Sequence, residues 1–132
     1  MRTAFNTLLL ACALCFSAHA QEANCNDPQT QFELNVCSAK EWERADAELN
    51  VVWRKARAVM KENDRHQPEE YKGAAQALLE GQRGWLAYRD GQCLAERFEV
   101  VGGSMAPMVG NLCLARMTRA RTQELKQMIE PR

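Results

Sequence analysis

Apolar residues recur every three or four positions along most of the chain, which is the spacing of one face of an α-helix. The clearest run lies between residues 42 and 60, and the charged residues among them fall on the opposite face. The apolar positions of this run are Trp42, Ala45, Leu49, Val52, Trp53, Ala56, Val59 and Met60. No stretch alternates between apolar and polar residues for long enough to predict a strand. The pattern therefore predicts an all-α fold.

Boundary residues divide this pattern into separate helices. Asp27 and Pro28 are typical of an N-cap and a first helical residue, which predicts a short N-terminal helix directly after them. Ser38 and Glu41 have the spacing of a capping box. A second, long helix is therefore expected to begin at Ser38 and to end near residues 63–64.

Two further helices are expected in the second half of the chain. The third begins at Pro68 and contains Gly81 and Gly84, whose missing side chains would let a neighbouring helix approach closely. The fourth follows a glycine-rich loop, with Ser104 as its N-cap. Its inward residues are expected to be Val109, Leu112, Cys113, Met117, Ala120, Leu125 and Met128. The predicted fold is a small antiparallel bundle of three long helices plus a short N-terminal helix.

The first 20 residues have the features of a secretory signal peptide. Arg2 supplies a positive charge, residues 5–16 are mostly apolar, and Ala18-His19-Ala20 is a small-residue cleavage site. Cleavage after Ala20 would leave residues 21–132 as a single helical domain without a transmembrane segment, in the periplasm or secreted. A competing interpretation makes residues 9–12 a lipoprotein signal, with Cys12 carrying the lipid.

Four cysteines follow the predicted cleavage site, namely Cys25, Cys37, Cys93 and Cys113. An even number of cysteines in a small exported domain indicates disulfides, and four cysteines allow three pairings. We favour Cys25–Cys37 and Cys93–Cys113, although a crossed pairing such as Cys25–Cys93 stays open. A zinc site is disfavoured because no two of these four cysteines have C-x-x-C spacing and only one histidine lies after the predicted cleavage site.

Charge and residue types exclude several classes of function. The formal net charge is +0 at pH 7, so no basic surface for nucleic acid is indicated. His66 is the one histidine after the signal peptide, and it lies in a charged turn before a proline. Nucleophilic catalysis needs a base beside the nucleophile, and His66 is a poor candidate for that base. We expect no catalytic residue, no cofactor and no metal, and hence a protein that acts by binding.

Polar residues interrupt the inner face of the third helix. Gln82, Trp85, Arg89 and Cys93 fall on one stripe, which is either an interior polar network or the floor of a binding surface. Asp46 flanks the inner face of the preceding helix and could form a partly buried, bidentate ion pair with Arg89. That structural pair would fix the helix register.

The same region and the following loop also supply candidate binding residues. Trp85, Tyr88 and Arg89 could form a recognition surface, because tryptophan, tyrosine and arginine dominate interface hot spots. The loop at Gly102, Gly103 and Ser104 is either a simple turn or a rigid tip that enters the cleft of a partner. The sequence does not distinguish between these two alternatives.

The order and spacing of several motifs resemble those of a known family. They are Cys25, Cys37, Ala45-Asp46-Ala47-Glu48-Leu49-Asn50, Gln82-Arg83-Gly84-Trp85-Leu86-Ala87-Tyr88-Arg89-Asp90, Cys93, Gly102-Gly103-Ser104, Cys113, Thr118, Arg121 and Leu125. Together they are similar to the LprI-like lysozyme-inhibitor family, whose N-terminal module was long catalogued as a domain of unknown function. The resemblance implies an exported, helical, disulfide-bonded envelope protein. It transfers no inhibitory residue by position.

The resemblance and the residues together lead to two functional hypotheses. In the first, the protein inhibits lysozyme, and the Gly102–Ser104 loop with Trp85, Tyr88 and Arg89 occludes the cleft of the enzyme. In the second, it is a non-inhibitory interaction module that docks on another cell-envelope protein or on peptidoglycan. Lysozyme among the partners would distinguish the first hypothesis from the second.

Overall fold

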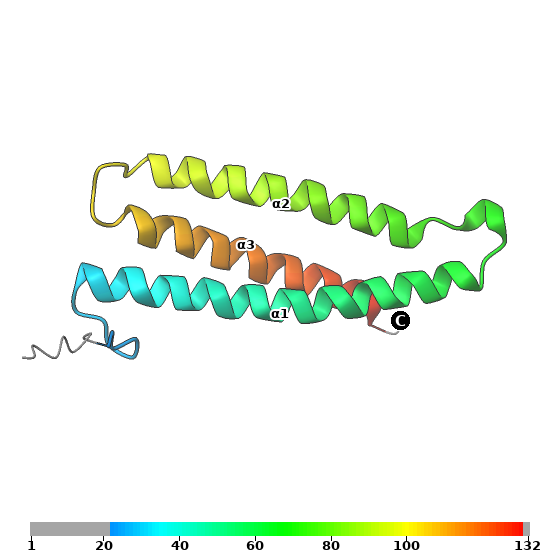
Figure 1. Cartoon of the computed structure of the whole chain (residues 1–132), viewed down its shortest axis with the longest axis horizontal. Helices are drawn as coiled ribbons and strands as arrows, with labels where there is room; N and C mark the ends of the chain where they lie inside the picture. The colour runs from blue at the N-terminus through cyan, green and yellow to red at the C-terminus, as the bar shows by residue number, and fades with distance from the viewer. Residues whose placement is uncertain (1–21, 131–132) are drawn as a thin grey trace, which may run out of the picture.

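The computed structural model describes residues 22–130, so the predicted signal peptide and Cys12 lie outside the described residues. The chain forms three long helices, α1 (Gln31–Arg65), α2 (Ala74–Phe98) and α3 (Ala106–Ile129), and a one-turn 3₁₀ helix η1 (Glu69–Tyr71) between α1 and α2. α2 runs antiparallel to both α1 and α3 (Figure 1). No strand occurs within residues 22–130, so the expected all-α bundle is confirmed.

The short N-terminal helix, predicted as a separate element, is the first part of α1. The capping box that opens α1 is formed by Thr30 and Glu33. The Thr30 hydroxyl accepts the Glu33 N–H at 3.2 Å, and the Glu33 carboxylate accepts the Thr30 N–H at 3.0 Å. Ser38, the predicted second start, instead donates its hydroxyl back to the Asn35 carbonyl at 2.8 Å. A serine bonded in this way stays inside a helix, so α1 continues unbroken through Ser38 to Arg65.

The start of α2 is set by a carboxylate from α1. Gly73, in the left-handed region with φ +133°, precedes the helix, which therefore begins at Ala74 and not at the predicted Pro68. Asp64 accepts the N–H groups of Gly73, Ala74 and Ala75 at 3.1, 2.9 and 3.0 Å. These bonds, above all the one from Ala75, lower the pKa of Asp64. One aspartate thus ties the end of α1 to the N-terminus of α2.

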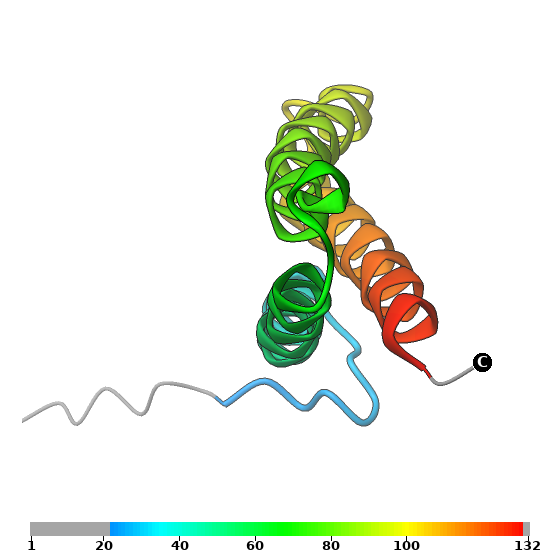
Figure 2. The ribbon, with the colours of Figure 1, turned by 90° about the vertical axis from the view of Figure 1, so that its right-hand side faces the viewer.

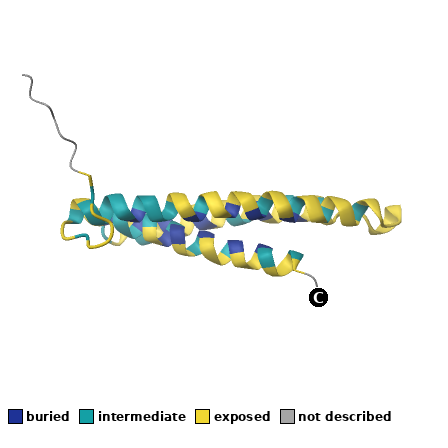
Figure 3. Ribbon diagram, turned by 90° about the horizontal axis from the view of Figure 1, so that it is seen from below, coloured by how far each residue is buried: buried dark blue, intermediate teal, exposed yellow. Residues whose placement is uncertain are grey.

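Viewed end-on, the three helices surround a narrow core (Figure 2). α1 packs most extensively against α3. The apolar cluster consists of Leu49, Val52, Ala56, Leu78 and Leu125, with Trp53, Met60, Trp85 and Ile129 partly buried around it. Buried positions lie between the helices, whereas the far end of the α1–α2 hairpin is exposed (Figure 3). No helix of the described chain is long and apolar enough to cross a membrane.

Two predicted packing details are wrong. In α3, the predicted inward residues Leu112, Ala120 and Met128 are exposed, whereas Thr118 and Thr122 are fully buried. The burial of Thr122 is compensated because its hydroxyl donates to the Thr118 carbonyl at 2.9 Å. In α2, an added Cβ at Gly81 or Gly84 would meet nothing within 4 Å, so these glycines do not permit the close helix approach that was expected.

Candidate functional site

The two disulfides lie near the end of the bundle where α2 turns into α3. We define the loop end as the loop of residues 99–105 with the adjoining ends of α1, α2 and α3, which come together there (Figure 1). Cys25–Cys37 ties the segment before α1 to the first turns of that helix, and Cys93–Cys113 joins α2 to α3. Both have Cα–Cα distances of 5.4 Å. The favoured disulfide pairing is confirmed.

Hydrogen bonds constrain the loop of residues 99–105. The Gly103 N–H donates to the Val100 carbonyl at 3.1 Å, and Asn35 on α1 donates its side-chain N–H to the Ser104 carbonyl at 2.9 Å. Gly102 has φ +87°, which a residue with a side chain adopts only with strain. Ser104 does not cap α3, because the N-cap residue is Met105 and no side chain caps this helix.

Apolar side chains project from this constrained loop. Val101 is 68% exposed, and Phe98 at the end of α2 is 60% exposed. Met105, at the start of α3, is also exposed. Large apolar groups on a fixed loop indicate a contact surface more strongly than single exposed apolar residues elsewhere.

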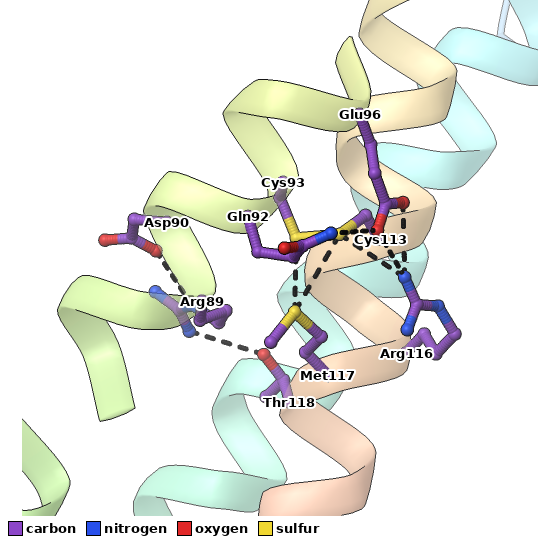
Figure 4. Close-up of a disulfide and its surroundings, with 9 residues drawn as sticks. All are labelled: Arg89, Asp90, Gln92, Cys93, Glu96, Cys113, Arg116, Met117 and Thr118. Carbon is purple, nitrogen blue, oxygen red and sulfur yellow. Dashed lines mark hydrogen bonds and ion pairs between the residues drawn. A yellow bond between two sulfur atoms is a disulfide. The ribbon is translucent and has the colours of Figure 1, made fainter. Parts of the chain in front are cut away.

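Arg89 on α2 occupies the interior, where Figure 4 shows its contacts with Asp90 and with Thr118 on α3. Its side chain is only 8% exposed. Nε donates to the Asp90 carboxylate at 2.8 Å, and Nη1 lies 3.3 Å from the Thr118 hydroxyl and 3.5 Å from the Asp46 carboxylate. The guanidinium also stacks over the Trp85 ring, 5.1 Å from its centroid. The expected Asp46–Arg89 pair is therefore present, but it is a single contact and not bidentate.

The three residues predicted as a recognition surface do not face the same way. Tyr88 is 61% exposed, Trp85 packs partly buried against the core, and Arg89 points inward. Successive helix residues are rotated by about 100°, so neighbours such as Tyr88 and Arg89 rarely share a face. Gln82 is also buried and accepts a hydrogen bond from Arg121 at 3.0 Å. The polar stripe of α2 is mainly an interior network, and Tyr88 is the member of the predicted trio most open to a partner.

A cavity of about 500 Å³ opens beside the Cys93–Cys113 disulfide, between the three helices. All three helices contribute apolar residues to its lining: Trp42 from α1, Leu94 from α2, and Pro107 and Leu114 from α3. Its polar lining consists of Arg89, Asp90, Arg97 and Asn111. The sequence could not indicate this cavity, because its residues come from three separate helices.

Ion pairs join the three helices near the cavity. Glu96 on α2 pairs with Arg116 on α3 at 2.8 Å, next to the disulfide (Figure 4). A hydrogen bond from Gln92, and then the contact with Arg116, lower the pKa of Glu96. Arg119 on α3 pairs with Glu41 on α1 at 2.7 Å. These contacts link α3 to both of its neighbours.

His66, the candidate for a catalytic base, is not among the residues that line the cavity. His66 lies in the α1–α2 connection, far along the bundle from the cavity, and contacts Glu62 at 2.8 Å. That hydrogen bond is the main cause of the lowered pKa of Glu62. Among residues 22–130, no group of three or more His, Cys, Asp or Glu side chains could hold a metal ion. The arrangement is suited to binding through the loop and the cavity.

Comparison with known proteins gives a family for the chain. A family model described as "Lysozyme inhibitor LprI" matches residues 22–125. An uncharacterized protein of Rhizobium meliloti (strain 1021) is 42% identical over 127 residues, which are 94% of this chain and 91% of that protein. No solved structure matches the chain. The family match spans both disulfides, the loop end and the cavity.

Proposed function

Because the chain belongs to the LprI lysozyme-inhibitor family, we propose that it binds a lysozyme and blocks the cleft of that enzyme with its loop end. It acts by binding and not as an enzyme. The site of action is the periplasm or the exterior of the cell, after cleavage behind Ala20 has released residues 21–132. Two disulfides support this location, because such bonds persist in oxidising compartments.

The observation that carries the proposal is the combination of rigidity and exposed apolar surface in the loop. Cys93–Cys113 and the hydrogen bond from Asn35 to the Ser104 carbonyl hold the loop in one conformation. A preorganised segment loses little conformational entropy on binding, so more of its contact energy becomes affinity. Val101 and Phe98 supply the apolar contact. Glycosidases place their catalytic carboxylates in a cleft, and a protruding loop that fills this cleft excludes the substrate.

The other residues predicted for binding take different parts in this proposal. Gly102, Gly103 and Ser104 shape the tip of the loop, and Tyr88 lies at the margin of the contact surface. Trp85 and Arg89 support the surface from inside the bundle, since Arg89 is already engaged by Asp46 and Asp90. Arg89 is therefore no longer proposed as a residue that contacts lysozyme directly.

A lysis assay tests the proposal. Purified, oxidised residues 21–132 are added to lysozyme and a bacterial cell-wall suspension, and turbidity is followed. We expect lysis to slow as the molar ratio of the protein to lysozyme rises. Unchanged lysis at large molar excess over several lysozymes would contradict the inhibitory function.

A pair of matched variants locates the contact surface. Val101→Asp places a charge in the exposed loop, and Tyr71→Asp makes a similar change at an equally exposed apolar residue in η1 (68% and 72% exposed). We expect Val101→Asp to weaken inhibition by about tenfold or more, because a charge in the centre of an apolar contact must be desolvated. Tyr71→Asp should inhibit like the unmodified protein. Equal losses in both variants would contradict the assignment of the loop end.

A second function, docking on another envelope protein without inhibition, is favoured by the outer face of α2. Tyr88 is 61% exposed there. Capture of partners from an envelope extract on the immobilised protein separates the two functions. The inhibitory function requires lysozyme among the partners, whereas the docking function requires a different protein that Tyr88→Ala no longer captures.

A further inference from the structure

We propose that the cavity beside the Cys93–Cys113 disulfide is a binding site for a small molecule with one carboxylate and a compact apolar body. This site is independent of the lysozyme contact, which uses the loop. The volume of about 500 Å³ lies within the range of small-molecule sites, roughly 300–1,000 Å³. The cavity is preformed, because the disulfide joins α2 and α3, which are two of the three helices that line it.

The charged residues that line the cavity favour an anionic ligand. Arg89 is already engaged by two carboxylates, Asp90 at 2.8 Å and Asp46 at 3.5 Å. Arg97 also lines the cavity, and within the described part of the chain no carboxylate lies within 4.0 Å of its guanidinium. Its aliphatic stem lies over Gly110, where an added Cβ would stand 3.5 Å from the Arg97 Cδ. The cavity lining therefore includes one cation, the exposed Arg97, without a described counter-charge.

Trp42, one of the residues that line the cavity, also has a buried polar atom without a partner. The Nε1–H of Trp42 is buried and finds no acceptor among the described residues. A buried donor that makes no hydrogen bond costs free energy, which an acceptor entering the cavity would recover after a small rotation of the indole. A carboxylate has two oxygens, so it can accept from Arg97 and from Trp42 together.

The apolar residues that line the cavity favour an anion with an apolar body. Trp42, Leu94, Pro107 and Leu114 offer apolar surface, which an apolar ligand body would cover. A phosphate or another divalent anion would need more than one free cation and would leave this surface uncovered. A monocarboxylate with an aryl or short alkyl body satisfies both the charge and the walls.

Titration with 3-phenylpropionate, followed by two-dimensional NMR of ¹⁵N-labelled protein, tests this assignment. The chain has three tryptophans, so three indole N–H signals are expected, and each is assigned through its Trp→Phe variant. We expect 3-phenylpropionate to shift the Trp42 indole signal saturably and to leave those of Trp53 and Trp85 nearly unchanged. The neutral amide of the same shape, 3-phenylpropanamide, should bind about tenfold more weakly, since it lacks the charge.

Two arginine variants complete the test. Arg97→Gln should weaken binding of 3-phenylpropionate by about tenfold. Arg83→Gln removes the same charge from an exposed position of the same helix outside the cavity, and it should change the affinity less than about twofold. Equal affinity for acid and amide, an unchanged affinity in Arg97→Gln, or no shift of the Trp42 signal at about 20 mM acid would overturn the proposal. Lysozyme inhibition is measured on the same variants, so each proposal can fail without the other.

Discussion

Arg89 shows how a single residue can look like a binding group in the sequence and serve the interior in the structure. The sequence placed it correctly on the inward stripe of α2 and paired it with Asp46. The sequence could not indicate that the Arg89 Nε would donate to Asp90 and the Arg89 Nη1 to Thr118, because those contacts depend on side-chain rotamers and on the register of α3. An inward arginine with three polar partners stabilises the helix register, and few of its N–H groups are free to bind a ligand.

Substitution of Arg89 separates these two roles. Arg89→Ala should lower the free energy of unfolding by about 2–3 kcal/mol, because it removes the contacts of the guanidinium and the packing of its stem. Arg89→Met keeps the volume and should cost only about 1 kcal/mol, since Asp46 and Asp90 are exposed enough to stay hydrated. Urea unfolding followed by circular dichroism measures both values. If Arg89→Met is as stable as expected but no longer inhibits lysozyme, the structural assignment of Arg89 is wrong.

The spacing of the apolar residues predicted that the helices exist and roughly how long they are. It predicted the residues at which they begin and end less well. Two capping signals compete at the start of α1, and the Thr30–Glu33 box is used while Ser38 turns its hydroxyl back into the helix. The start of α2 was misjudged because its cap, Asp64, is nine residues or more away in the chain from the N–H groups that it accepts. Local signals cannot reveal a cap that the preceding helix supplies.

The cap by Asp64 makes a prediction about pH. The hydrogen bonds from Ala75, Gly73 and Ala74 lower the pKa of Asp64 in the folded state. A carboxylate with a lowered pKa stabilises the fold above the ordinary aspartate pKa, near 4, and this stabilisation is lost as the pH falls through the lowered value. Asp64→Asn keeps an oxygen acceptor but does not titrate. It should be less stable than the unmodified protein at pH 7, and the difference should vanish in strong acid.

Unfolding by urea at several pH values between neutral and about 2 measures this difference. Glu70→Gln is the matched control, because Glu70 is an exposed acid of the same connection without a hydrogen bond to any described side chain. A pH-independent difference for Asp64→Asn, or an equal effect of Glu70→Gln, would contradict the capping role.

At the scale of the whole molecule, the bundle has an apolar half and a disulfide half. The large buried aliphatic residues, Leu49, Val52, Leu78 and Leu125, gather toward the middle and the C-terminal end of α3. Near the loop end, the buried residues are mostly small or polar, such as Ser38, Ala106 and Cys113. A domain of this size with so few large buried residues needs covalent support. The disulfides supply it where the apolar core is thinnest.

Removal of either disulfide should therefore destabilise the protein measurably. Cys93→Ser/Cys113→Ser opens a link between residues 20 apart, and Cys25→Ser/Cys37→Ser opens one between residues 12 apart. Each double variant should lose about 3 kcal/mol according to the chain-entropy model. The Cys93/Cys113 variant should also lose inhibition, since the loop is no longer fixed. Thermal unfolding of both variants checks the first expectation, and an unchanged midpoint would contradict it.

Hydrogen–deuterium exchange of the oxidised protein, with and without saturating lysozyme, tests the central claim most directly. The account predicts that lysozyme slows exchange of the backbone amides at residues 98–105 and leaves residues 65–73, at the opposite end of the bundle, unchanged. Exchange that is unaffected by lysozyme throughout, or slowed only at residues 65–73, would contradict it.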